Sequence, residues 1–305
     1  MKQDAQSIHS NQPQVIPEQR GAFARFIARF TLARILLFGA LLLAMLIGLQ
    51  IGIASVAHQI PRPVRPLWSL PAELLYGALM LWLYCMLVRY FERREVVELA
   101  RRGAARRVAT GALLGAVLFS IVYAAMALGG YLHQVRFGGL AGFWSPLATA
   151  VGAGVGEELL FRGVIFRLTE ERLGTAAALI VSSLLFGLVH AANVGATPVS
   201  TAAIALEAGA LLGIAYSASR SLWLPIGLHF GWNFTEGGIF GTAVSGGQSR
   251  GLLDSVLSGP NLMTGGSFGP EASLIAVAVS LTATVTIGLW AVRHGRWRPW
   301  NPQRP

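Results

Sequence analysis

The sequence predicts an all-α fold: a polytopic membrane protein of about eight transmembrane helices. Of the 305 residues, 54% are hydrophobic and only 12% are charged, whereas about 25% of the residues of a soluble domain are charged. Apolar stretches of the length that a bilayer requires recur along the chain. Between them, arginines gather in short connectors, as is typical of membrane-spanning chains.

Eight apolar stretches justify the number of helices, since each is long enough to span a bilayer. Polar residues 1–30 before them are expected to form a flexible N-terminal segment. Residues 31–293 make up the helical domain, and residues 294–305 form a basic tail. The stretches are 31–57, 70–88, 109–132, 143–166, 174–192, 199–219, 221–240 and 269–293.

The arginines determine the predicted orientation. With eight spans, the basic residues of the N-terminal segment, of the connector 89–107 and of the C-terminal tail fall on one side of the membrane. The positive-inside rule makes that side cytoplasmic, so both termini are expected inside the cell. The Gly- and Ser-rich stretch 241–268 is then expected outside, as a mobile loop.

The net charge of +10 raises the question of nucleic acid as a partner. Proteins that bind nucleic acid carry a basic patch on a folded domain, whereas here the arginines lie in connectors between apolar spans. The sequence contains no internal repeat and no stretch that predicts a soluble domain. We therefore expect the lipid bilayer as a partner, and no nucleic acid.

The first polar cluster, Glu157-Glu158-Leu-Leu-Phe-Arg162, lies within the fourth apolar stretch. Ionisable side chains in hydrocarbon are costly and usually belong to a functional site. Positions four apart share a helix face, so Glu158 is expected to pair with Arg162 and to leave Glu157 free for chemistry. In the alternative interpretation all three residues only tie helices together, which leaves Glu157 without a role.

Two further clusters supply histidines: Phe186-Gly-Leu-Val-His190 and His229-Phe-Gly-Trp-Asn233. His229 and Asn233 are four apart, so their N–H groups can point at one place, as an oxyanion hole requires. A lone histidine near a membrane interface is often structural, but an acid on a neighbouring span gives His190 a partner for activating water. The combination indicates hydrolytic chemistry.

These clusters, in this order and spacing, resemble the CPBP family of intramembrane proteases. The family includes the type II CAAX prenyl endopeptidases and bacterial relatives linked to bacteriocin processing and immunity. Glu-Glu-x-x-x-Arg, Phe-x-x-x-His and His-x-x-x-Asn carry the resemblance, over a protease core of residues 140–240. It implies a catalytic cavity among the later helices and, for a bacterial relative, the inner (plasma) membrane.

The resemblance also implies a role for each polar side chain. Glu157 would be the general base that activates water, assisted by His190. His229 and Asn233 would polarise the scissile carbonyl and hold the oxyanion. The pair Glu158–Arg162 would be structural support. The implied substrate is a peptide or a prenylated protein.

Metal dependence is open at this point. Two histidines and a glutamate can hold Zn²⁺, so Glu157, His190 and His229 are the candidate ligands if a metal is present. The chain has no His-Glu-x-x-His helix, and a metal-free pair of Glu157 and His190 needs the same residues. We prefer a metal-free site. Two further acids, Glu207 and Glu236, lie in the later stretches without an assigned role, and Glu207 departs from the family pattern.

The expected function is that of an intramembrane endopeptidase. It would hydrolyse peptide bonds of membrane-associated or prenylated (CAAX-type) proteins or peptides with glutamate- and histidine-activated water. An ion- or proton-coupled transporter is one alternative, although transporters tend to show repeats or broken half-helices. A non-catalytic membrane adaptor or immunity-type protein is the other, and it would not require Glu157 to meet both histidines.

Overall fold

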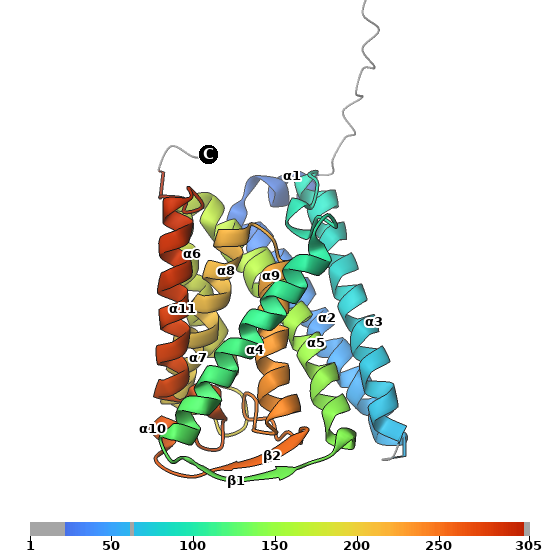
Figure 1. Ribbon diagram of the computed structural model, residues 1–305. Coiled ribbons are helices and arrows are strands. Elements are labelled where there is room, and N and C mark those ends of the chain that lie inside the picture. The colour runs from blue at the N-terminus through green and yellow to red at the C-terminus, as the bar shows by residue number, and fades with distance from the viewer. Residues whose placement is uncertain (1–21, 62–63, 302–305) are drawn as a thin grey trace, which may run out of the picture.

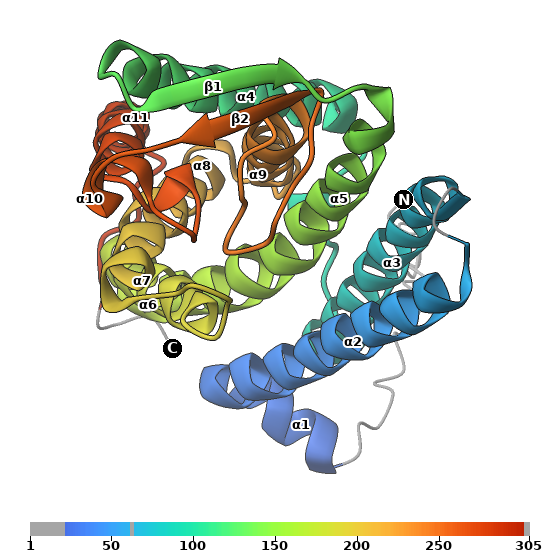
Figure 2. The same cartoon turned by 90° about the horizontal axis from the view of Figure 1, so that it is seen from below.

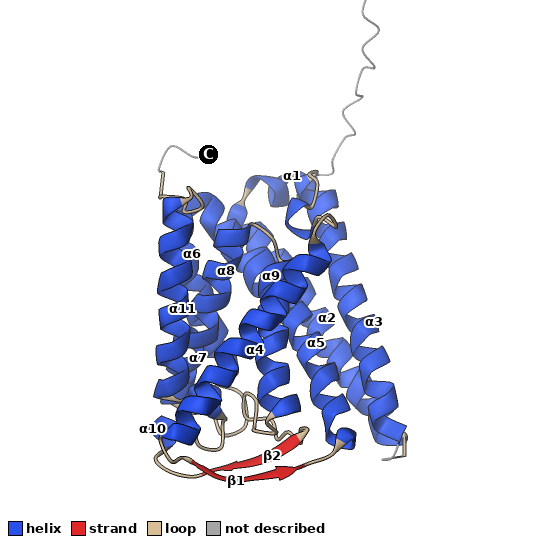
Figure 3. Cartoon of the chain, in the orientation of Figure 1, coloured by secondary structure: helices blue, strands red, loops and turns tan. Residues whose placement is uncertain are grey.

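The helices of the chain run between two ends of a bundle (Figure 1; Figure 3), and the computed structural model describes residues 22–61 and 64–301. One end carries α1 (Ala22–Arg29) and the end of α11 (Leu274–Arg293), and the opposite end carries two short strands. Helices dominate because they satisfy every backbone N–H and C=O within one segment, as a bilayer demands. The predicted helical, polytopic membrane fold is confirmed.

Six helical stretches of the described residues are long and apolar enough to cross a membrane. A further helix, α9 (Trp223–Asn233), is shorter than these. The number of eight spans therefore stays a prediction. The six stretches are Thr31–Gln59, which is α2; Leu67–Glu92, which includes most of α3 (Arg65–Leu87); Ala104–Leu128, which is α4; and Leu140–His190, Pro198–Ser219 and Leu274–Arg293.

The longest stretch, Leu140–His190, contains α5 (Trp144–Glu158) and α6 (Arg167–His190) and reverses direction within α6. Gly174 has φ 79° and ψ 174°, which are not helical values. A continuous helix would separate Glu157 from His190 by about 50 Å, yet their side chains approach to 3.9 Å. The break at Gly174 is therefore what brings the acid and the histidine face to face.

Three helical stretches at the centre of the bundle contain wider, π-helical turns. Such turns are frequent at functional sites, and each one here contains or follows a buried acid: Glu158, Glu207 or Glu236. They are η5 (Leu159–Phe166) between α5 and α6, η6 (Ala205–Gly209) between α7 (Pro198–Ile204) and α8 (Ala210–Ser219), and η7 (Phe234–Ile239) after α9.

The backbones of α4 and α9 are in contact through four glycines. Gly111 and Gly115 of α4 face α9, and Gly227 and Gly231 of α9 face α4. A Cβ on any of the four would overlap a backbone carbonyl of the other helix. In a membrane, small residues four apart permit such an approach, and close packing then drives helix association. This contact fixes the helix that carries two of the predicted site residues.

Two antiparallel strands, β1 (Leu132–Phe137) and β2 (Leu253–Leu257), lie across the end opposite α1 (Figure 2). They are an addition to the predicted all-α fold, because connectors outside the apolar layer can pair their backbone groups with one another. The stretch 241–268, predicted as a mobile loop, contributes β2 and α10 (Asn261–Thr264). The Leu252 N–H also donates to the Gly238 carbonyl at 2.8 Å, which ties this stretch to η7.

Residues 22–29 form α1, although a flexible segment was predicted for residues 1–30; residues 1–21 lie outside the described residues. Ile27 is buried, and Phe23 packs edge-to-face on Phe91 with ring centroids 6.5 Å apart. A helix this short needs tertiary packing to be stable, so its own sequence is a weak signal. Its exposed Phe26 and Arg25 suit a helix that lies in the membrane interface.

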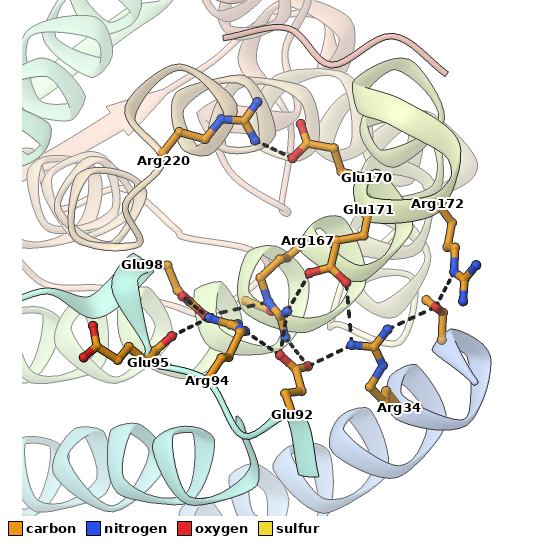
Figure 4. A network of polar contacts seen from close by, with 12 residues as sticks. Arg34, Glu92, Arg94, Glu95, Glu98, Arg167, Glu170, Glu171, Arg172 and Arg220 are labelled. Carbon is orange, nitrogen blue, oxygen red and sulfur yellow. Dashed lines mark hydrogen bonds and ion pairs between the residues drawn. The ribbon is translucent and has the colours of Figure 1, made fainter. Parts of the chain in front are cut away.

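Ion pairs connect several elements at the end that carries α1 (Figure 4). Glu92 accepts hydrogen bonds from Arg167 at 2.8 Å and from Arg94 at 2.7 Å, and Arg34 of α2 lies 3.5 Å from it. Burial alone would raise the pKa of Glu98, but the hydrogen bonds from Arg94 and the charge of Arg167 outweigh it and hold that pKa below its ordinary value. The network closes this end of the bundle.

The basic C-terminal tail packs against the break in α6. The Thr175 N–H donates to the Arg298 carbonyl at 2.8 Å, and the Arg298 N–H donates to the Thr175 hydroxyl at 2.9 Å. Arg220 donates to Glu170 and to the Arg296 carbonyl. The tail is therefore part of the turn that reverses the chain.

Gly231→Val should force α9 away from α4, because the new side chain would overlap the Ala112 carbonyl. Overpacking of this kind costs roughly 1–3 kcal/mol, occasionally more. Thermal unfolding of the purified protein in detergent measures the loss. Gly48→Val on α2 is the matched control, because a Cβ there meets nothing within 4 Å. Equal midpoints for the two variants would contradict the packing argument.

Candidate active site

A cavity of about 790 Å³ reaches into the bundle from the end that carries the strands. All four residues predicted to be catalytic line it: Glu157, His190, His229 and Asn233. Residues from the segments 141–149 and 244–250 line its mouth. The volume is in the range of pockets that enclose most of a ligand. Residues from three separate stretches of sequence thus face one polar space within an apolar bundle.

Glu157 and His190, which both line the cavity, approach each other there. His190 Nε2 lies 3.9 Å from Glu157 Oε2, too far for a direct hydrogen bond. The other ring nitrogen, Nδ1, lies 2.7 Å from the Phe186 carbonyl oxygen. A carbonyl can only accept, so Nδ1 carries the hydrogen and Nε2 of the neutral ring keeps its lone pair. Both groups at the gap can therefore accept a proton.

His229 is oriented by Glu158. Its Nδ1 donates to Glu158 Oε1 at 3.1 Å, which leaves Nε2 as the ring nitrogen available to the cavity. Asn233 lies one turn further along α9 and lines the same cavity. The spacing of four residues between His229 and Asn233 does place both side chains at one site, as the sequence predicts.

Arg162 connects the helices around the site. It is fully buried and donates to Glu158 Oε1 at 2.8 Å, so the contact expected from their spacing is formed. Its other terminal nitrogen donates to the carbonyls of Ala208 and Gly209 in η6, each at 3.0 Å. Its Cζ also lies 4.6 Å from the centre of the Phe186 ring, within cation–π range.

The two extra acids of the sequence do not line the large cavity. Glu207 and Glu236 are buried, and each has one carboxylate oxygen without a hydrogen-bond partner among the described residues. Glu207 lines a cavity of about 20 Å³ next to His190 and Asn233, which has room for one water molecule.

Three residues beside the site were missed by sequence reasoning: Asn193 and Ser245, which line the large cavity, and Glu271, which lines the small one. Glu271 Oε1 accepts hydrogen bonds from the Ser245 N–H at 2.6 Å and from its hydroxyl at 2.7 Å. The Asn193 side chain donates to the Ser245 carbonyl at 3.0 Å. Burial raises the pKa of Glu271, against the opposing effect of these Ser245 hydrogen bonds. The only available signal was a lone acid in a Gly- and Ser-rich stretch.

These contacts stabilise an unfavourable backbone conformation. Ser245 has φ 47°, a left-handed value that residues other than glycine rarely adopt. Such a conformation persists only where the surroundings determine it, and here the N–H, the hydroxyl and the carbonyl of Ser245 all have partners. The wall segment 244–250 is thereby fixed at its base.

The candidate metal ligands do not form a metal-binding group. Within residues 22–61 and 64–301, no group of three or more His, Cys, Asp or Glu side chains is placed to hold an ion. His229 directs Nδ1 to Glu158, and His190 directs Nδ1 to the Phe186 carbonyl. Both contacts leave Nε2 available, as in histidines that bind a metal, so the preference for a metal-free site stays a prediction.

A comparison with known protein families finds a match, and it covers the part of the chain that contains this site. Residues 139–235 match the family model described as type II CAAX prenyl endopeptidase Rce1-like. The matched segment contains all six predicted site residues and extends from just before α5 to just after α9. No curated protein and no solved structure matches the chain.

Arg162→Met should destabilise the protein strongly, because it leaves the Glu158 carboxylate without its arginine in a dry environment. Removal of one partner of a buried pair costs about 3–5 kcal/mol. Thermal unfolding and the yield of folded protein measure it. Arg172→Met is the matched control, since Arg172 is a half-buried arginine that donates to Thr31.

The double variant Glu158→Gln, Arg162→Met tests the reason for the loss. If the stranded charge is responsible, the second substitution should recover part of the stability that Arg162→Met removes. A further loss of stability in the double variant would mean that Glu158 contributes by something other than its pairing with Arg162.

Proposed function

We propose that this chain, of which residues 139–235 match the type II CAAX prenyl endopeptidase Rce1-like family, hydrolyses peptide bonds with a water molecule activated by Glu157 and His190. The observation that carries the proposal is the gap of 3.9 Å between the Glu157 carboxylate and His190 Nε2 inside the cavity. The family match supports a peptidase in general, and the role of each residue is part of the proposal.

Glu157 is the general base in this proposal. Its side chain is 26% exposed and lines the cavity, whereas the neighbouring Glu158 side chain is fully buried and paired. A water molecule between Glu157 and His190 can donate one hydrogen to each. Its oxygen lone pairs then point away from both residues, into the cavity. A peptide carbonyl carbon placed there would be attacked as the carboxylate takes the proton.

His229 and Asn233 stabilise the oxyanion. The Asn233 amide supplies N–H groups as it stands. His229 Nδ1–H donates to Glu158, so Nε2 must carry a second hydrogen before the ring can donate to an oxyanion. The negative Glu158 carboxylate stabilises the positive charge that this second hydrogen brings. Preorganised donors of this kind act on the charge that develops in the transition state.

The proton taken from water completes the reaction. It resides on the Glu157 carboxyl or on His190 Nε2, both of which face the attacked carbon, and it passes to the nitrogen of the leaving amine as the C–N bond breaks. Each residue ends the cycle in the state in which it began. Water and the side chains of this chain supply every group that these steps use.

The proposed substrate is a membrane-associated peptide or protein, and the proposed location is the inner (plasma) membrane of a bacterial cell. A segment that binds in extended form through the mouth reaches Glu157 without unfolding of the bundle. The transporter and the adaptor that the sequence left open gain no support from the comparisons. The approach of Glu157 to His190 and the convergence of both histidines on one cavity favour hydrolysis.

Glu157→Gln should reduce the cleavage rate by at least roughly two orders of magnitude, because an amide cannot accept the proton from water. The measurement is proteolysis of a membrane-anchored reporter in liposomes that contain only this protein and the reporter. Glu95→Gln, at an exposed acid of the opposite end, is the matched control and should cleave at the wild-type rate. Near-normal cleavage by Glu157→Gln would rule out the mechanism.

Asn233→Ala should reduce kcat by about 10²–10³-fold, the usual effect of removing one oxyanion donor. KM should change little, because the amide acts on charge that is present only in the transition state. Steady-state kinetics on the same reporter separates the two constants. A rise in KM with unchanged kcat would assign Asn233 to substrate binding instead.

A further inference from the structure

We infer that the cavity opens on the extracytoplasmic face of the membrane, so that the substrates are exported or membrane-anchored peptides whose cleavable segment lies outside the cytoplasm. The substrate class rests on the proposed peptidase function. The side on which the cavity opens follows from the structure independently of that function. Three observations support it: the position of the mouth, the distribution of arginine, and the packing on the far side of the site.

The mouth lies at the end of the bundle that carries the strands. Its lining residues include Gly142, which follows β1, and Ser249 and Arg250, which precede β2. Figure 2 looks onto this end, where β1 and β2 pass beside the ends of α5 and α9. Glu157 lies 13 residues beyond the start of α5, or about 20 Å along the helix axis. The cavity therefore connects one membrane face with the middle of the bundle.

The described arginines are concentrated at the opposite end. They occur in α1, in the connector from Arg89 to Arg107, in the turn from Arg167 to Arg172, and after Arg293. The strand-bearing end has Arg65, Arg136 and Arg250 among the described residues. Positive charge in short connectors marks the cytoplasmic side of a membrane protein. The arginine-rich end is thus cytoplasmic, and the mouth faces away from it.

Packed residues close the path from the cytoplasmic end to the site. Leu159, Phe161 and Phe166, on the cytoplasmic side of Glu157 and Glu158, are almost completely buried. Beyond them lies the ion-pair network of Glu92 and Arg167 (Figure 4). An extended peptide entering from this side would have to displace both the apolar layer and the ion pairs. Access through the mouth requires neither.

The inference separates this chain from a peptidase that trims prenylated tails in the cytoplasm. Such a tail would meet the closed, arginine-rich end of the bundle. A peptide that is anchored in the membrane, or passes through it, presents its outer segment directly to the mouth. The chemical class of substrate is therefore a polypeptide segment at the extracytoplasmic surface, with no requirement for a prenyl group.

Cysteine labelling in intact cells tests the orientation. Ser258→Cys and Ala105→Cys place one exposed thiol at each end of the full-length protein, in a background with Cys85→Ala. A membrane-impermeant maleimide should label Ser258→Cys in intact cells, and Ala105→Cys only after permeabilisation. Labelling of Ala105→Cys in intact cells, with or without Ser258→Cys, would overturn the inference. His133→Cys, exposed on β1, is the second reporter if Ser258→Cys reacts poorly after permeabilisation.

Reporters of defined sidedness test the substrate class. One single-span protein carries the same cleavable segment on its extracytoplasmic side, and its inverted counterpart carries it on the cytoplasmic side. Wild type, but not Glu157→Gln, should cleave the first and leave the second intact. Cleavage of the cytoplasmic segment alone would overturn the inference and leave the proposed peptidase intact. Absence of cleavage in both, with the expected labelling pattern, would instead refute the peptidase and leave the orientation standing.

Discussion

One oxygen of the Glu158 carboxylate holds the catalytic part of the bundle together, because a charge removed from water must find its partners within the protein. It accepts hydrogen bonds from Arg162 and from His229, which joins α9 to the helix that carries Glu157. Arg162 extends the link to the carbonyls of η6 and to the ring of Phe186. The Phe186 carbonyl in turn fixes the tautomer of His190. Both histidines are thereby linked to a single buried charge.

Two adjacent glutamates acquire opposite roles from helix geometry alone. Successive helical residues point about 100° apart, so Glu158 enters the packed interior while Glu157 reaches the cavity. The same spacing rule explains why α9 can present His229 and Asn233 to one space. The glycine contact packs α9 closely against α4, and the carbonyls of η6 that Arg162 binds lie in one of the π-helical turns. The positions of the site residues therefore depend on backbone features, namely the close glycine contact and the π-helical turns, that the polar motifs do not reveal.

The sequence predicts the helical membrane fold, the contact of Glu158 with Arg162 and the common face of His229 and Asn233, since these depend on apolar length and on spacing within one helix. The separate stretches 143–166 and 174–192 predict that the chain reverses between them, but the break at Gly174 and the distance from His190 to Glu157 depend on tertiary packing, which spacing within one helix does not reveal. The hydrogen bonds from Ser245 to Glu271 could not be predicted from periodicity in the sequence, because they join two segments outside the long helices. The strands and α1 are stabilised by partners distant in the chain, which local patterns do not reveal.

The reversal at Gly174 has a consequence for the order of events during synthesis. A residue with a Cβ at this position would collide with the backbone of residues 298–300, and the Thr175 hydroxyl is bound by an N–H that lies 123 residues further along the chain. The hairpin that sets the acid opposite its histidine is therefore completed by a segment that leaves the ribosome after every helix of the bundle. A nascent chain stalled before that segment would contain all the polar side chains of the candidate site, yet lack the last contacts that close the turn between them.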